Sequence, residues 1–430
     1  LCEETRRFAY DSLNHLYGLD TEKNQGVKMD DVSGFEDMGQ LDRYNAVIRK
    51  IAQTAPIRIC PGEKVSGAAT LGMAIHHLVP ATYKGKALLG GVSHLTIDFE
   101  TVLKRGLTGI RGDITASLSR HTEPRKIAFL ESCLSVVDSF EIWHKRYVDA
   151  LKDRPGYEQN YRNLLHVPFS PAGNFYEAVQ SLWVTFAFVR LCGNWPGIGR
   201  IDYLLGDYLK KDLADGVLTL DEAREILAHF FIKGCEWVRG GDYGSGDAQH
   251  YQNILLSGVD QNGEDITNEV TFLVLDIMEE LGISDFPIAV RLHAGTPAGL
   301  IRRMAEERGS EVVRFGGGIL AFYNESLILK SLTDYGYPAS DVWKFANDGC
   351  WEVQVPGKTC FTYSPFDGLE LLQKRKGNCD AQAALTAVLL RRMGCEAQIV
   401  QGTFLRADAP EPVDHAWVRA VVNGTACWFD

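Results

Sequence analysis

The sequence predicts an α/β protein with parallel strands, followed by a smaller α+β unit. Between residues 219 and 324, stretches with apolar side chains at helical spacing alternate with short continuous apolar runs. This alternation is typical of βαβ units, in which helices join consecutive parallel strands. After Gly357 the pattern changes to one helix and three short β segments. The 430 residues suffice for one large domain with an appendage.

Three helices are predicted from apolar spacing and from their end signals. Thr101–Leu118 has apolar residues at helical spacing. Asn174–Arg190 begins with a good capping residue and is apolar on nearly all sides, which indicates a buried helix. Thr219–Gly234 opens with a Thr-x-x-Glu capping box and closes on glycine.

The next segment predicts two parallel strands joined by a helix. A helix is expected over residues 265–282, a buried strand over 287–293, a helix over 297–309 and a strand over 316–324. Because strand, helix and strand follow one another, the two strands are expected to be parallel.

Composition and charge exclude several classes of partner. The net charge of −12 disfavours nucleic acid and anionic membranes, which reward clustered Lys and Arg. No apolar run is long enough to span a membrane, and the first residues lack the apolar core of a signal peptide, so we expect a cytoplasmic protein. The ten cysteines form no C-x-x-C pair, so neither a metal site nor a disulfide framework is expected.

The stretch Asn-Asp-Gly-Cys-Trp-Glu, residues 347–352, is the first candidate site. It follows a helical stretch and is predicted to be a loop of the kind that carries reacting groups beyond strand ends in α/β sheets. Cys350 is either a buried core thiol or one half of a chemical pair with Glu352.

Several blocks in order resemble the glycyl radical enzymes, the pyruvate formate-lyase superfamily, over about residues 46–370. The blocks include "SHLTIDFETVLKRGLTGI", "NFYEAVQSLWV", "GRIDYLLGDYLKKDL", "PIAVRLHAGTP", "GGGILAFYNESLI" and "NDGCWE". The resemblance implies a ten-stranded α/β barrel, present here as its N-terminal part, with Cys350 as the thiyl radical residue. Glu352 matches the base of the dehydratase branch, which reads Gly-Cys-x-Glu. A carboxylate in that place takes a proton from the substrate hydroxyl.

Two further residues follow from the same resemblance. His94 and Asp98 lie in a block that helps to build the substrate pocket of relatives, and they are candidate contacts to a small polar substrate. A structural polar role is the alternative for both.

One departure from this family concerns the radical itself. Its members store the radical on a glycine in an Arg-Val-x-Gly-Tyr-like loop, which the printed sequence does not contain. The resemblance therefore implies a glycine that is supplied in trans by another polypeptide or that lies beyond the printed sequence, together with a radical-SAM activating partner and an anaerobic setting. A partial barrel also exposes apolar strand edges, which the small unit or a second subunit is expected to cover.

The C-terminal unit predicts a second candidate site. Asn378 precedes a helix, which places Cys379 at a helix N-terminus where the dipole favours the thiolate. Asn423-Gly424 predicts a two-residue hairpin turn, with Trp417 opposite Asp430. His415 then shares a face with Asp430.

Nucleophile, base and orienting acid are the roles that acyl transfer requires. The segments "KRKGNCDAQAALTAVLLRRMGCEAQIVQG", "DHAWVRAVVNG" and "CWFD" resemble the transglutaminase-like cysteine peptidase superfamily, which implies Cys379 as nucleophile, His415 as base and Asp430 as orienter. The expected domains are therefore 1–370, pyruvate formate-lyase-like, and 371–430, transglutaminase-like.

Three functional hypotheses follow. The first is a lyase or dehydratase of the glycyl radical type that uses Cys350 and Glu352. The second is a thiol hydrolase or acyltransferase that uses Cys379, His415 and Asp430, with the large domain as scaffold. The third is a non-catalytic fusion that acts as a binding module.

Overall fold

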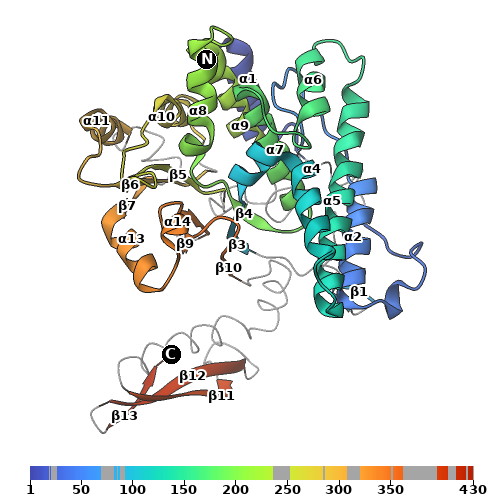
Figure 1. The fold of residues 1–430 in the computed structure, drawn as a ribbon, viewed down its shortest axis with the longest axis vertical. Coiled ribbons are helices and arrows are strands. Elements are labelled where there is room, and N and C mark those ends of the chain that lie inside the picture. Colours follow the sequence, from blue (N-terminus) through green and yellow to red (C-terminus); the bar gives the residue numbers. More distant parts are fainter. Residues whose placement is uncertain are drawn as a thin grey trace. The chain divides into compact units, whose positions relative to one another are not determined.

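A computed structural model describes most of the chain, which divides into two compact units, Leu1–Thr362 and Tyr363–Asp430 (Figure 1). The described residues are 1–18, 20, 27–68, 82–84, 86–87, 93–235, 252–283, 286–307, 320–349, 352–361, 395–404, 413–422 and 425–429. The predicted domain boundary at 370 lies outside them and stays a prediction.

Five strands of the first unit run parallel in chain order. β3 (Ser93–Thr96) pairs with β4 (Trp195–Gly197), and β5 (Ile254–Ser257) pairs with β6 (Ile288–Leu292), which pairs with β7 (Leu320–Asn324). A parallel bridge between Gly199 and Ile254 links the two groups. The predicted α/β class with parallel strands is confirmed, and closure of the strands into a barrel stays a prediction.

The predicted helices of this unit are present, and local capping explains their starts. α4 (Phe99–Leu118), α7 (Phe175–Leu191), α9 (Leu220–Lys233), α10 (Glu269–Leu281) and α11 (Ala298–Glu307) match the predicted segments. Asn174 caps α7 through the amide of Glu177, and Thr219 forms the predicted capping box with Glu222.

Other helices complete this unit. They are α1 (Glu3–Leu13), η1 (Phe35–Asp37), α2 (Gln40–Thr54), α5 (Pro124–Leu151), α6 (Glu158–His166), α8 (Ile201–Ala214), α13 (Glu325–Asp334) and α14 (Ala339–Val342). α8 and α10 lie on one side of the β5–β7 sheet and α13 and α14 on the other (Figure 1). Two short strands, β1 (Thr82–Tyr83) and β2 (Lys86–Ala87), pair with each other.

The stretch predicted to be a loop is largely a hairpin. β8 (Ala346–Asp348) pairs antiparallel with β9 (Glu352–Gln354), so the connection between the two strands is shorter than the loop predicted over residues 347–352. β8 contacts β3, β4 and β5, and this burial holds its residues in a strand that lacks an alternating pattern. β10 (Cys360–Phe361) then pairs with β3.

The second unit contains an antiparallel sheet in the order β11-β12-β13. β11 (Glu396–Phe404) pairs with β12 (Val413–Val422), which pairs with β13 (Thr425–Phe429). Val422 lies opposite Thr425, as the predicted Asn423-Gly424 turn requires. The predicted helix over 377–394 lies outside the described residues.

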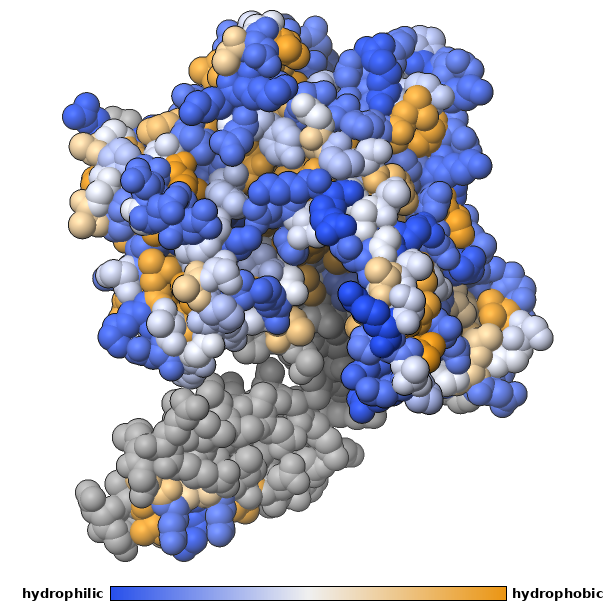
Figure 2. Space-filling model, in the orientation of Figure 1, coloured by the Kyte–Doolittle hydropathy of each residue, from blue (hydrophilic) through white to orange (hydrophobic). Residues whose placement is uncertain are grey.

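The surface agrees with the composition. On the face drawn in Figure 2, the coloured residues are mostly hydrophilic and hydrophobic side chains are scattered among them. Among the described residues, no helix is both long and apolar enough to cross a membrane.

Candidate functional site

The hairpin β8–β9 carries the first candidate site. Cys350 lies outside the described residues, but Gly349 and Glu352 on its two sides are described. Gly349 has a φ of 57°, a conformation that glycine adopts easily, and its carbonyl accepts a 3.2 Å hydrogen bond from Asn253 Nδ2. The turn is therefore held from β5, and Glu352 follows it as the first residue of β9.

Buried polar side chains gather around this hairpin. Four of them, Arg190 of α7, Asn253 just before β5, Asp348 of β8 and Gln354 of β9, are each at most 2 % exposed. Among the described residues, Asn253 Oδ1, both Asp348 carboxylate oxygens and Gln354 Nε2 make no hydrogen bond of good geometry. Because buried polar atoms are normally paired, this concentration is typical of a site for a polar ligand.

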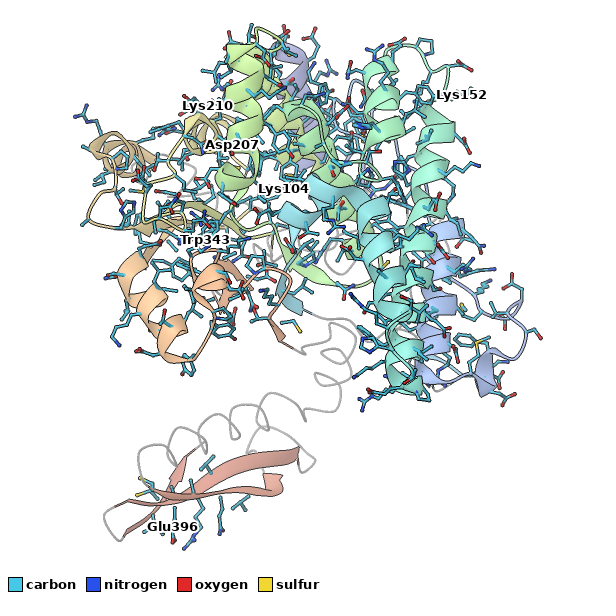
Figure 3. The ribbon with its side chains drawn as sticks, in the orientation of Figure 1. Lys104, Lys152, Asp207, Lys210, Trp343 and Glu396 are labelled. Carbon is cyan, nitrogen blue, oxygen red and sulfur yellow. The ribbon has the colours of Figure 1, made fainter. Side chains whose placement is uncertain are left out.

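A buried ion pair fixes the chain that leads into β8. Arg291 donates hydrogen bonds from Nε (2.7 Å) and Nη2 (2.5 Å) to Glu325. Its Nη1 donates to the carbonyl oxygens of Trp343 (2.9 Å), labelled in Figure 3, and Phe345 (3.1 Å). Arg200 Nη1 donates to the same Trp343 carbonyl at 2.8 Å. Two buried guanidinium groups thus hold the backbone just before Asn347.

Asp348 was not among the predicted site residues. It is wholly buried and lies directly opposite Glu352 in the hairpin register. Burial raises the pKa of Asp348 well above its ordinary value, against the backbone amides of Gly349 and Leu95 and the charge of Arg190. The sequence offered a signal for Asp348, because Asp348 and Glu352 each lie two positions from Cys350. The burial of Asp348, however, depends on strands that are distant in the sequence.

The two predicted substrate contacts lie in or beside β3. His94 is a residue of β3, and its side chain is outside what the structure describes. Asp98 caps α4, where its carboxylate accepts from Thr101 N (3.1 Å) and Thr101 Oγ1 (2.7 Å). Asp98 also lines a cleft with Arg200 and Lys358. Capping explains the presence of Asp98, and contact of either residue with substrate stays a prediction.

A neighbouring cleft of about 410 Å³ lies between α4 and α8. Lys104 and Asp207, labelled in Figure 3, are among its lining residues. Glu100 lies between the two clefts and accepts hydrogen bonds from Lys104 and Lys344, both at 2.6 Å. These ion pairs occupy Glu100 and Lys104, two of the charged groups that line the cleft.

The second candidate site lies in the small unit. Cys379 and Asp430 lie outside the described residues, and His415 is a residue of β12 whose side chain is not described. The register of β12 and β13 runs from Val422 opposite Thr425 to Val418 opposite Phe429. One residue further, the same register would give the predicted pair of Trp417 with Asp430, which stays a prediction. His415 lies opposite Gly402 in β11, so no β11 side chain occupies the position facing it.

Among the described residues, no cluster of three or more His, Cys, Asp or Glu side chains could hold a metal ion. The site chemistry visible in the structure is that of carboxylates, amides and guanidinium groups.

Comparison with family models shows which family the chain belongs to. The family model described as pyruvate formate lyase-like matches residues 81–366, about two thirds of the chain. The chain belongs to the pyruvate formate lyase-like family. The model of the transglutaminase-like superfamily matches residues 327–430, so the two matches overlap over the segment that contains the β8–β9 hairpin.

Curated relatives of this pyruvate formate lyase-like chain are longer proteins. Isethionate sulfite-lyase from Bilophila wadsworthia (strain 3_1_6) is 28 % identical over 290 residues, which cover 62 % of this chain and 34 % of the relative. Trans-4-hydroxy-L-proline dehydratase from Clostridioides difficile is 25 % identical over 295 residues, covering 63 % and 37 %. The chain thus spans about a third of the length of these relatives.

Solved structures share the fold. The B12-independent glycerol dehydratase from Clostridium butyricum gives a TM-score of 0.69 at 20 % identity, covering 83 % of this chain and 55 % of that one. Hydroxyproline dehydratase from Clostridioides difficile gives a TM-score of 0.67 at 19 % identity, covering 84 % and 56 %. The first unit therefore has the pyruvate formate lyase-like fold over about half the length of these structures.

Proposed function

We propose that the chain carries the cysteine half of a lyase or dehydratase site of the glycyl radical type. Cys350 is the hydrogen-abstracting residue and Glu352 the base that takes the proton of a substrate hydroxyl. The radical originates on a glycine outside the sequence printed here and is installed by a radical-SAM activating enzyme under anaerobic conditions.

The observation that carries this proposal is the position of Glu352. It begins β9 directly after the turn that contains Cys350, beside buried polar groups from α7, β5 and β8. A base must lie within hydrogen-bonding reach of the proton that it removes, and Glu352 is only two positions from Cys350, the residue proposed to abstract hydrogen from the same substrate. The polar surroundings favour a small hydroxylated substrate, such as those in the names of the two curated relatives.

The test uses the chain under strict anaerobiosis with a glycine-bearing polypeptide of the family and an activating enzyme. Electron paramagnetic resonance reports the radical, and mass spectrometry reports products from isethionate and trans-4-hydroxy-L-proline. Product formation that is lost in Cys350→Ser and in Glu352→Gln, but kept in Cys133→Ala, would support the proposal. Cys133 lies on α5 and serves as the matched control. If the radical forms but no product appears, or if product still forms in Cys350→Ser, the result would count against the proposal.

A second function is favoured by the β12–β13 register. Extended by one residue beyond Val418 and Phe429, this register would pair Trp417 with Asp430 and set an acid on the strand face of His415. We propose Cys379, His415 and Asp430 as the nucleophile, base and orienter of a transglutaminase-like thiol enzyme.

Alkylation with iodoacetamide at about pH 6, mapped by mass spectrometry, tests this second function, because only a thiol with a depressed pKa reacts quickly there. Fast labelling of Cys379 that disappears in His415→Ala would support an assembled site. Labelling of Cys379 no faster than that of Cys427, which lies on β13, would contradict it.

A further inference from the structure

Two carboxyl side chains face each other across the turn that contains Cys350. Asp348 ends β8, Glu352 begins β9, and the two are register partners. Directly opposed residues of an antiparallel pair point to the same face, with Cβ atoms about 5 Å apart. The two carboxyl groups are therefore neighbours by backbone geometry alone.

The described groups around this pair come from several elements. The positive charge of Arg190, at the end of α7, lowers the pKa of Asp348, and the negative charge of Glu352 raises it. From β3 the neighbour is the amide of Leu95, from the turn the amide of Gly349, and from β5 the neutral Asn253. Tyr323 of β7 is a further titratable group near Glu352. Two adjacent carboxyl groups, one of them wholly buried, favour retention of one proton, because two like charges repel at this distance.

Burial decides which of the two groups holds the proton. Asp348 is wholly buried, and its carboxylate lies so close to β4 that a Cβ atom on Gly197 would be 3.1 Å from Oδ1. Glu352 is only partly buried. Because an ion loses more solvation in the more buried place, the proton belongs on Asp348.

We propose that Asp348 and Glu352 form a one-proton pair, in which Asp348 holds the proton and is a positioning residue for the base Glu352. This inference rests on the proposed lyase function and deepens it, because it assigns the charge states on the two sides of the turn. Near neutral pH the base is Glu352, and its partner across the hairpin carries no competing negative charge.

Titration of the carboxyl carbons by ¹³C NMR tests the pair in the full chain, selectively labelled in the Asp and Glu side chains. Asp348→Asn identifies the resonance of Asp348. We expect Asp348 to be protonated at pH 7 and its titration midpoint to shift to lower pH in Glu352→Gln, which removes the like charge. Asp341→Asn, on α14 and paired with Lys358, is the matched control and should leave the midpoint unchanged.

An ionised Asp348 at pH 7, or a midpoint that does not move in Glu352→Gln, would overturn the proposal. A stability measurement covers the case in which Asp348→Asn alters the fold. Asparagine mimics a protonated carboxyl group, so this variant should unfold at the wild-type urea midpoint, and a large loss would show that the native group is ionised. Neither measurement needs radical or substrate, so failure here is distinguishable from failure of the lyase function.

Discussion

The buried pair Arg291–Glu325 offers the sharpest test of how the hairpin is held. Both side chains are at most 2 % exposed, and Arg291 binds the backbone of Trp343 and Phe345 as well as Glu325. Glu325→Gln keeps the shape of the side chain but removes the charge opposite a buried guanidinium group. The free energy of unfolding should fall by about 3–5 kcal/mol, the usual cost of an uncompensated buried charge.

Two controls separate charge from packing. Arg303→Met breaks pairs with Asp276 and Glu279, which are partly exposed, so it should cost no more than about 1 kcal/mol. The double variant Arg291→Met with Glu325→Met removes both charges and should be more stable than Glu325→Gln.

Urea unfolding followed by far-ultraviolet circular dichroism measures these differences. A loss below about 1 kcal/mol for Glu325→Gln would refute the reasoning, because exposed pairs cost that little.

Three further predictions concern packing, protonation and capping. Gly197→Ala should destabilise the chain by about 1–3 kcal/mol in the same urea assay, because the added Cβ would lie 2.9 Å from a β8 carbonyl oxygen. The control Gly112→Ala has open space around its Cβ position and should be neutral or stabilising. The pKa of His229 is lowered from 6.5 to about 3, mainly because the side chain is buried and also because lysines lie nearby. The unfolded chain then binds the extra proton between those values, so stability should fall on acidification by up to about 1.4 kcal/mol per pH unit, and His229→Gln should flatten that slope. Thr219→Ala should cost about 1 kcal/mol through loss of the α9 cap, and an equal loss in Thr115→Ala, inside α4, would contradict this.

Local chemistry explains which elements the sequence could predict. The start of α7 at Asn174 and of α9 at Thr219 depends on side chains within four residues, and both caps are present. The turn predicted at Asn423-Gly424 likewise implied the pairing of Val422 with Thr425, which is present. Asp98 could have been recognised as a cap, because Asp-x-x-Thr before an apolar run is a local signal of this kind.

Tertiary neighbours explain what the sequence could not predict. β8 is short and buried, and its strand conformation depends on contacts with β3, β4 and β5 rather than on a pattern of its own. The burial of Asp348 requires Gly197 and Arg190, which are far from it in the chain. The long helix α5 begins at a Glu-Pro step, a start signal that its mixed pattern of apolar residues obscured.

The most direct test of the account is turnover by the activated protein, measured under anaerobic conditions with isethionate and trans-4-hydroxy-L-proline. With the radical confirmed by electron paramagnetic resonance, we predict product from the wild-type protein and none from Cys350→Ser. A Cys350→Ser variant that forms product at the wild-type rate would contradict the assignment of the β8–β9 turn as the reactive centre.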